Sequence, residues 1–126
     1  MRDDTNFLGM FAKETETRSV AAGTLLFAKG DPAHEMFIVK TGQLQVFDGN
    51  FVFETLGPGD VIGEMALVDQ SPRSASVKAL TACDVIPINE KRFLWMVGQT
   101  PFFAIRMLKV LATRLRKTNE LAKAMQ

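Results

Sequence analysis

Short hydrophobic runs separated by glycine-containing turns occupy the chain from about residue 20 to residue 89. The runs are rich in Phe, Val, Ile and Leu, and they cover residues 24–28, 36–40, 43–48, 51–56, 75–80 and 83–88. Runs this short at this spacing predict antiparallel strands. The tripeptide Asp48-Gly49-Asn50 lies between two runs and predicts a tight hairpin, because glycine accepts the positive φ that such a turn requires.

Helical patterns flank these runs on both sides. Residues 3–14 combine N-cap side chains with apolar residues at helical spacing, which predicts a short N-terminal helix. After the last run, Asn89 can cap one helix and Thr100-Pro101 can start a second, because proline at the first helical position loses no hydrogen bond. No glycine or proline follows Pro101, so one helix of about 25 residues is expected to continue to the end.

The chain of 126 residues is 47% hydrophobic, which suits a single core. We therefore expect one α+β domain over residues 1–126. Its centre is an antiparallel β-roll, or jelly-roll barrel, over about residues 20–89. A short N-terminal helix precedes the roll, and C-terminal helices cover about residues 90–125.

The last helix carries an apolar seam whose members are three or four residues apart, the spacing of a coiled coil. They are Leu108, Leu111, Leu115, Thr118, Ala122 and Met125. The seam can pack on the helix's own roll, or it can form a homodimer through residues 105–125. A helix of about 37 Å overhangs a domain whose radius of gyration is near 14 Å, which favours a partner, whereas its many basic residues oppose a second copy.

Charge and composition exclude several functional classes. The net charge is +1, and residues 91–126 carry eight basic side chains and one acidic, which we interpret as a solvated helix face without nucleic-acid contact. One histidine, His34, and one cysteine, Cys83, are too few for a metal enzyme of the cupin type, so no metal is expected. No apolar run approaches the ~20 residues of a membrane span, and the acidic start differs from a signal peptide. These features predict a cytoplasmic protein without membrane partners.

Residues 61–77 carry the candidate chemistry. Gly63 and Ala66 are small enough for close backbone approach, and Glu64-Met65-Ala66-Leu67 can form one helical turn whose free N–H groups attract an anion. Arg73 enters an apolar strand, where an unpaired guanidinium is costly and a phosphate would satisfy it. Glu64 could accept from a sugar hydroxyl, or it could simply form an ion pair with Arg73.

The stretch Gly63-Glu64-Met65-Ala66-Leu67, together with Pro72-Arg73-Ser74-Ala75, resembles the phosphate-binding cassette of the cyclic nucleotide-binding domain family. That family includes bacterial catabolite activator proteins and regulatory subunits of cyclic-AMP-dependent protein kinase. The glycine pattern upstream also looks like the family's β-roll landmarks, in order, so that the resemblance covers roughly residues 6–122.

The resemblance implies roles for individual residues. Arg73 and Ser74 would bind the exocyclic oxygens of a cyclic phosphate, and Glu64 would accept from the ribose 2′-OH. Backbone N–H groups of Gly63, Glu64, Met65, Ala66 and Leu67, next to Arg73, Ser74 and Ala75, would complete the cradle. Val61, Ile62 and Leu67 would pack around the sugar or belong to the core.

Base recognition is implied for Thr118-Asn119, which stands where the family's dimer helix carries a Thr-Ser pair. Thr118 could equally be a tolerated helix threonine. The resemblance implies cAMP as the ligand. Because Asn119 can donate a hydrogen bond as well as accept one from the adenine amine, cGMP is the alternative.

The resemblance therefore implies a non-enzymatic regulatory or sensor domain that couples cyclic nucleotide binding to rearrangement of its C-terminal helix and acts on an unknown effector protein. Too few residues follow the helix for the family's helix-turn-helix domain, so a stand-alone domain or a fragment is expected. A ligand-free roll acting as an assembly module is the other alternative, but the presence of both Glu64 and Arg73 argues against it.

Overall fold

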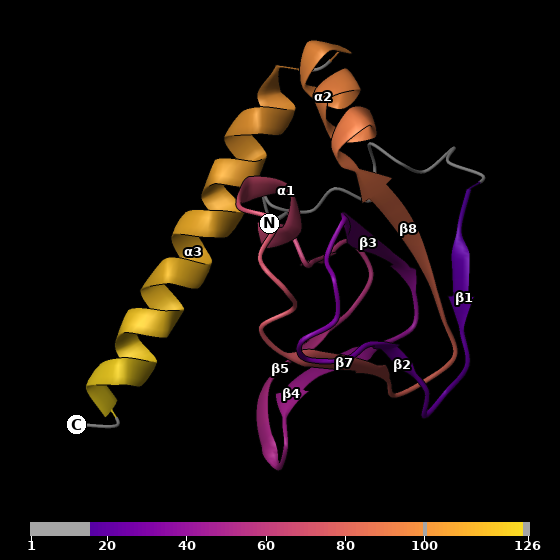
Figure 1. Cartoon of the computed structure of the whole chain (residues 1–126), viewed down its shortest axis with the longest axis vertical. Coiled ribbons are helices and arrows are strands. Elements are labelled where there is room, and N and C mark those ends of the chain that lie inside the picture. The colour runs from indigo at the N-terminus through magenta and orange to yellow at the C-terminus, as the bar shows by residue number, and fades with distance from the viewer. Residues whose placement is uncertain (1–15, 100, 125–126) are drawn as a thin grey trace.

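Two four-stranded antiparallel sheets form the body of the protein, and helices follow them (Figure 1). The computed structural model describes residues 16–99 and 101–124, without the side chains of residues 118 and 121–124. The first sheet has the strand order β1-β8-β3-β6, and the second has the order β2-β7-β4-β5. The elements are β1 Arg18–Val20, β2 Leu25–Phe27, β3 Glu35–Thr41, β4 Leu44–Asp48, β5 Phe51–Leu56, β6 Val61–Ile62, α1 Met65–Val68, β7 Ser76–Ala79, β8 Cys83–Asn89, α2 Glu90–Gln99 and α3 Phe102–Ala124.

This architecture confirms the predicted α+β roll with C-terminal helices. The six hydrophobic runs became β2, β3, β4, β5, β7 and β8. The hairpin between β4 and β5 turns at Gly49, which has a φ of 58°. Two strands, β1 and β6, were not predicted, because three and two residues are too few to show a period. The short helix expected over residues 3–14 lies outside the described residues.

The central strands β3 and β8 are buried on both faces, which explains why they read as continuous hydrophobic runs. Alternate side chains of β3 enter two separate clusters. Met36 and Ile38 join Phe103 and Met107 of α3 in one cluster. Phe37 lies in the other, inside the roll between the two sheets. The first sheet is thus packed between the second sheet and the C-terminal helices.

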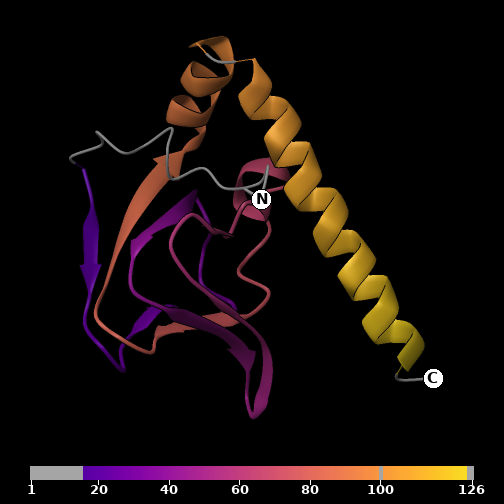
Figure 2. The same cartoon turned by 180° about the vertical axis from the view of Figure 1, so that it is seen from behind.

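Helix α2 begins where the sequence predicts, and α3 begins at Phe102, directly after Pro101; its expected cap, Thr100, lies outside the described residues. The Asn89 side chain accepts a hydrogen bond from the backbone N–H of Arg92 at 2.9 Å, which caps α2. α3 continues as one helix from Phe102 to Ala124, and its C-terminal end lies to the side of the roll, away from the strands (Figures 1 and 2). Its residues Phe103, Met107 and Val110 are buried against the first sheet, so this part of α3 packs on its own roll. Within the described residues, no helix is both long and apolar enough to cross a membrane.

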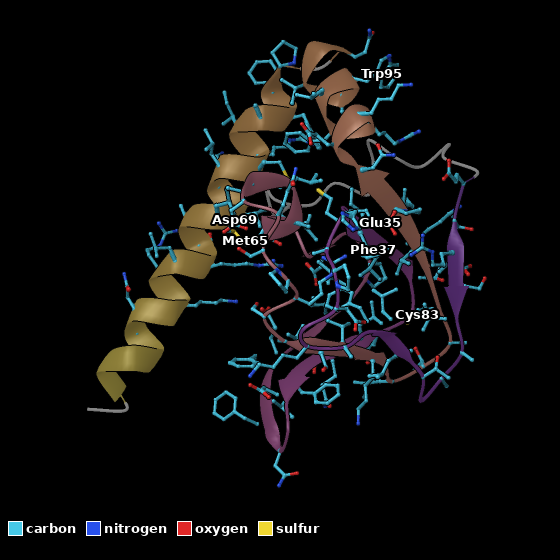
Figure 3. All side chains as sticks on the ribbon, viewed as in Figure 1. Glu35, Phe37, Met65, Asp69, Cys83 and Trp95 are labelled. Atoms are coloured by element: carbon cyan, nitrogen blue, oxygen red, sulfur yellow. The ribbon has the colours of Figure 1, made fainter. Side chains whose placement is uncertain are left out.

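Cys83 begins β8 and is buried, on the side of the roll away from α3 (Figure 3). Its thiol lies 3.2 Å from the Gln43 carbonyl and 3.1 Å from the Thr81 carbonyl. Gly42 packs directly against it: a Cβ at that position would lie 2.5 Å from the sulfur atom. The tight packing, together with a φ of 87° at Gly42, makes this corner of the roll intolerant of a larger residue.

Candidate functional site

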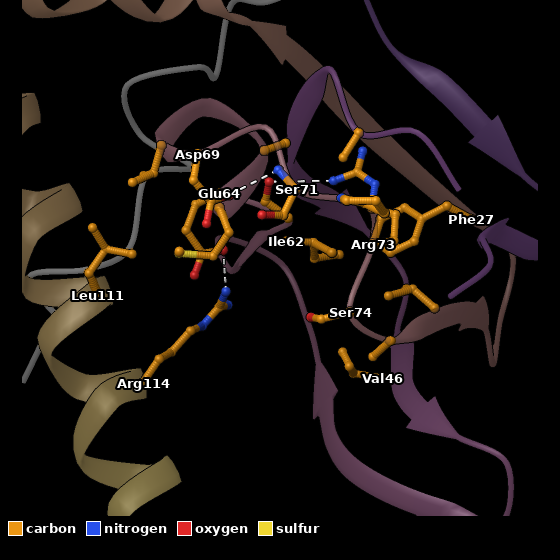
Figure 4. A pocket seen from close by; sticks show the side chains of 18 of the residues that line it. Phe27, Val46, Ile62, Glu64, Asp69, Ser71, Arg73, Ser74, Leu111 and Arg114 are labelled. Carbon is orange, nitrogen blue, oxygen red and sulfur yellow. Dashed lines mark hydrogen bonds and ion pairs between the residues drawn. The ribbon is translucent and has the colours of Figure 1, made fainter. Parts of the chain in front are cut away.

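A cavity of about 690 Å³ opens between the roll and α3 (Figure 4). Its walls come from three parts of the chain that are distant in sequence. The segment around α1 and the loop that follows it form one side, the inner faces of β4, β5 and β7 form the floor, and α3 closes the remaining side. The lining residues include Met65, Ala66, Ser74, Ala75, Val46, Leu56, Leu111 and Leu115. The structure therefore brings the two predicted parts of the cassette, residues 63–67 and 72–75, together around one cavity.

The turn predicted after β6 forms as α1, beginning at Met65. The backbone N–H of Ala66 donates to the Gly63 carbonyl at 3.1 Å, and that of Leu67 donates to the Glu64 carbonyl at 3.1 Å. Gly63 has a φ of 75°, and a side chain there would collide with Nη1 of Arg73. The positive φ therefore favours glycine at this position, and a Cβ there would also displace the Arg73 guanidinium from its present place.

The backbone of Arg73 is fixed by the turn at Gly30 and Asp31. Its N–H donates to the Asp31 carbonyl at 2.9 Å, and its carbonyl accepts from the Gly30 N–H at 2.8 Å. These two bonds set the direction in which the Arg73 side chain leaves the loop, toward the cavity wall beneath Gly63. The glycine-containing turn upstream of the cassette therefore helps to fix the position of Arg73.

The Arg73 guanidinium is buried, at 8% exposed. It donates to the carbonyls of Glu35 at 2.7 Å and Gly63 at 3.4 Å, and lies 4.1 Å from the centre of the Phe27 ring. Burial lowers the pKa of Arg73, while the nearby carboxylates of Glu35 and Asp31 raise it. An arginine still remains protonated at neutral pH. Among the described residues, Arg73 forms no salt bridge, and its Nε is buried without a hydrogen-bond partner. A positive charge held by neutral groups at a cavity wall is suited to an anion.

Glu64 is buried at 3% exposed, and its carboxylate forms an ion pair with Arg114 of α3. The other terminal nitrogen of Arg114 donates to the backbone carbonyl of Val61. The alternative of a Glu64–Arg73 ion pair was therefore wrong: the arginine that reaches Glu64 lies 50 residues away along the chain. Sequence reasoning missed Arg114, although it follows Phe103, Met107 and Val110 at the spacing of the buried face of the helix.

The remaining predicted site residues divide into three groups. Met65, Ala66, Ser74 and Ala75 line the cavity, and so does Ile62 of β6. Val61 and Leu67 pack instead with the cluster between the first sheet and the helices, which makes them core residues. Asn119 is exposed, one turn beyond Leu115, and the side chain of Thr118 lies outside the description. The α3 residues that line the cavity are Leu111, Arg114 and Leu115.

No group of three or more His, Cys, Asp or Glu side chains that could hold a metal ion occurs in residues 16–99 and 101–124. The cavity's polar groups are thus the two arginines, the buried Glu64, Ser71 and Ser74, and two further carboxylates, Glu54 and Asp69. A ligand that suits this set combines an anionic group with hydroxyl donors and an apolar part that fits the hydrophobic walls.

Comparison with known proteins agrees with this chemistry. A family model described as the cyclic nucleotide-binding domain matches residues 17–100. The CRP-like cAMP-activated global transcriptional regulator of Mycobacterium tuberculosis is 26% identical over 117 residues, which cover 89% of this chain and 52% of that protein. The chain spans about half the length of the curated regulators that it matches.

Solved structures match both the roll and the helices. The catabolite activator protein of Thermus thermophilus aligns with a TM-score of 0.81 at 25% identity, covering 96% of this chain and 62% of that one. A structure from work on a cyclic-GMP-dependent signalling pathway of bacterial phytopathogenesis aligns with a TM-score of 0.76 at 31% identity, covering 91% and 94%. Matches also include an EAL enzyme and an uncharacterized NTE family protein, so similar domains occur in proteins linked to enzymes as well as in regulators.

Proposed function

The chain belongs to the cyclic nucleotide-binding domain family, and we propose that it binds cAMP and acts as a non-enzymatic regulatory domain. The observation that carries the proposal is the buried guanidinium of Arg73 at the wall of the cavity, next to Gly63 and α1, which forms no salt bridge within the part of the chain that the structure describes. Such a group is stabilised by a phosphate, which offers several charged acceptor oxygens to one guanidinium. We place its action in the cytoplasm, upstream of an effector protein.

The bound nucleotide would exchange existing contacts for stronger ones. The Arg73 nitrogen that now donates to the Gly63 carbonyl at 3.4 Å would instead donate to an exocyclic phosphate oxygen. The Ser74 hydroxyl would donate to another phosphate oxygen. The amides of Ala66 and Leu67 already donate within the turn, so any phosphate contact there would be shared between two acceptors. Glu64 would accept from the ribose 2′-OH, as the family resemblance implies.

The choice of base rests on the residues beyond Leu115. We propose that Thr118-Asn119 contacts adenine once the helix closes on the ligand, with Asn119 accepting from the exocyclic amine. The relatives include proteins described with cAMP and one described with a cyclic-GMP-dependent pathway, so cGMP remains the second candidate.

Isothermal titration calorimetry with cAMP, cGMP and 5′-AMP tests the proposal. We expect saturable binding of cAMP that is tighter than binding of cGMP, and weaker binding of 5′-AMP, whose dianionic open phosphate does not match the cradle. Binding of cGMP with the higher affinity would reverse the nucleotide assignment. Heats indistinguishable from dilution for all three nucleotides would instead support the ligand-free assembly module.

We also propose that binding changes how α3 packs on the roll. Leu111, Arg114 and Leu115 form one wall of the cavity. A ligand that contacts them therefore stabilises the position of α3 packed on the roll relative to a displaced position. We expect saturating cAMP to slow backbone amide exchange in residues 108–120, measured by hydrogen–deuterium exchange mass spectrometry. The strand β3, which is largely buried and contributes no residue to the cavity lining, serves as the internal reference. Identical exchange of this part of α3 with and without cAMP would contradict the coupling.

We also propose a homodimer through residues 105–125, in which the seam consists of the residues of α3 that are exposed on the roll-bound helix. Leu111 lines the cavity and is half-buried, whereas Leu108 and Leu115 are each 63% exposed. Leu115 borders the cavity as well, and together with Leu108 it continues the exposed stripe of Ile105 and Ala112. We expect a mass near twice 14.0 kDa by light scattering, and a monomer after Leu108→Glu. The matched control is Leu94→Glu, since Leu94 is 60% exposed on α2. A wild-type mass of one chain would refute the dimer.

A further inference from the structure

Large apolar side chains are exposed where α2 and α3 meet, at the end of the molecule opposite the β4–β5 hairpin (Figure 1). Leu94 and Trp95 of α2 are 60% and 57% exposed, and Phe102, the first residue of α3, is 71% exposed. We call these three residues the corner patch. A single exposed apolar residue is ordinary on a protein surface, but several large ones at one end of a small domain indicate a contact surface.

The core of the domain does not use the corner patch. On α2 the buried residue is Met96, which packs in the cluster between the first sheet and the helices. On α3 it is Phe103, directly after Phe102. Trp95 lies at the outer side of α2, away from the roll (Figure 3). The patch therefore belongs to the faces of the two helices that are turned from the core, where a contact outside the domain can reach it.

Basic side chains flank the corner patch in both helices. Residues 90–109 contain one acidic residue, Glu90, and four basic ones: Lys91, Arg92, Arg106 and Lys109. Lys91 precedes Leu94 and Trp95 by three and four residues, which puts all three on one face of α2. On the other side of Trp95 lies Glu35, whose carboxylate is paired with Arg18 at 2.9 Å. The surroundings of the patch are thus predominantly positive.

Exposed tryptophan and phenylalanine side chains next to lysines and arginines suit the surface of a bilayer that contains anionic lipids. Aromatic rings enter the headgroup region, while long basic side chains reach the lipid phosphates. Each lysine or arginine near such a surface adds to the attraction. The corner of α2 and α3 also projects beyond the strands in both views, and a convex end of this kind can touch a flat surface without hindrance from the roll (Figures 1 and 2).

We propose that the corner patch binds the surface of an anionic lipid bilayer, with Leu94, Trp95 and Phe102 in the headgroup region and Lys91 and Lys109 at the lipid phosphates. The expectation of no membrane partner came from the lack of a membrane span, and a peripheral contact does not need one. The inference does not rest on the nucleotide, because no residue of the patch lines the cavity. The patch also lies outside the α3 stripe that we assign to the dimer.

Sedimentation with unilamellar vesicles tests the inference, and fluorescence gives a second readout. Trp95 is the chain's single tryptophan and the chain has no tyrosine, so its emission reports on the patch alone. We expect the protein to sediment with vesicles of phosphatidylglycerol and phosphatidylcholine in equal parts, and Trp95 emission to shift to shorter wavelength as the ring leaves water. Vesicles of phosphatidylcholine alone should bind roughly tenfold more weakly or less, and added salt should weaken the binding to anionic vesicles.

Two pairs of substitutions remove the two components of the contact and keep Trp95 as the probe. Leu94→Ala combined with Phe102→Ala should lower the affinity for anionic vesicles by about tenfold or more, because two apolar groups no longer leave water. Lys91→Gln combined with Lys109→Gln should lower it by a similar factor, roughly tenfold.

The matched control for the apolar pair is Phe51→Ala combined with Phe53→Ala. These residues are 48% and 47% exposed on β5, at the opposite end of the molecule, and should leave the affinity for vesicles unchanged. The control for the charges is Lys78→Gln on β7. Thermal melting of each variant shows that it is folded at the temperature of the measurement.

Equal binding to anionic and neutral vesicles would overturn the inference. Sedimentation without a shift of Trp95 emission would also overturn it, because the contact would then lie elsewhere on the chain, and so would a loss of affinity that is as large in the β5 control as in the corner variant. Absence of binding to either vesicle would exclude the bilayer and assign the patch to a protein partner. Binding of cAMP, measured by calorimetry without lipid, is unaffected by any of these outcomes.

Discussion

Arg73→Ala is expected to weaken cAMP binding by about 2–3 kcal/mol, roughly 30- to 140-fold, because it removes the charged donor from the phosphate site. The side chain is buried at the cavity wall and donates to neutral carbonyls, and the other arginine that lines the cavity, Arg114, is paired with Glu64. Isothermal titration calorimetry of the purified variant gives the affinity. Arg73→Lys keeps the charge but loses the fork of two nitrogens, and should fall between alanine and the wild type.

The matched control for Arg73→Ala is Lys78→Ala. Lys78 lies on the next strand, β7, with its ammonium 5.3 Å from the centre of the Phe47 ring, and it does not line the cavity. Removing that charge tests whether the net charge of the sheet alone attracts the nucleotide. If Lys78→Ala lowered the affinity as much as Arg73→Ala, or if Arg73→Ala bound cAMP as the wild type does, the phosphate site would be assigned to the wrong residue.

Phe103→Ala is expected to lower the free energy of unfolding by about 3–5 kcal/mol, the usual cost of removing a buried aromatic ring. Phe103 is fully buried, its ring centre lies 5.2 Å from that of Phe93, and it joins α3 to the first sheet. Urea denaturation followed by circular dichroism measures the change.

The adjacent Phe102 provides the control for this prediction. It is 71% exposed and begins the same helix, so Phe102→Ala should cost about 0.5 kcal/mol or less. The two variants remove the same group one residue apart and differ only in the face of the helix that is affected. Equal losses of stability would mean that α3 does not pack on the roll through the Phe103 face.

The strands of the roll were predictable because their signals are local. The hairpin around Gly49 needs a residue that tolerates positive φ, and the hydrophobic runs on either side fix the strands that it joins. β6 was not predictable in the same way. It has two residues, and its pairing with β3 depends on the position of Phe37 and Ile38 rather than on any pattern of its own.

The site was predictable only as far as its residues lie near one another in sequence. Gly63, Glu64 and Arg73 stand within one loop–turn–strand segment, and the family resemblance adds their roles. The ion-pair partner of Glu64, Arg114, is on α3. A contact between segments so far apart in sequence cannot be predicted from the residue spacing within either segment. Leu111 was predicted as part of one apolar seam with Leu108 and Leu115, and its spacing left open whether the seam packs on the roll or on a second copy. Only the docked position of α3 shows that Leu111 lines the cavity.

The buried position of Cys83 makes its thiol a probe of how often the roll opens. It is the chain's single cysteine, it is 3% exposed, and its sulfur is enclosed by the Gly42 corner and by strands on both sides of β8. A thiol reagent can reach it only in molecules whose first sheet has opened, so the rate of alkylation counts those openings. The alkylation rate of Cys83, measured with and without nucleotide and with no added label, therefore reports how much a bound nucleotide reduces opening of the roll.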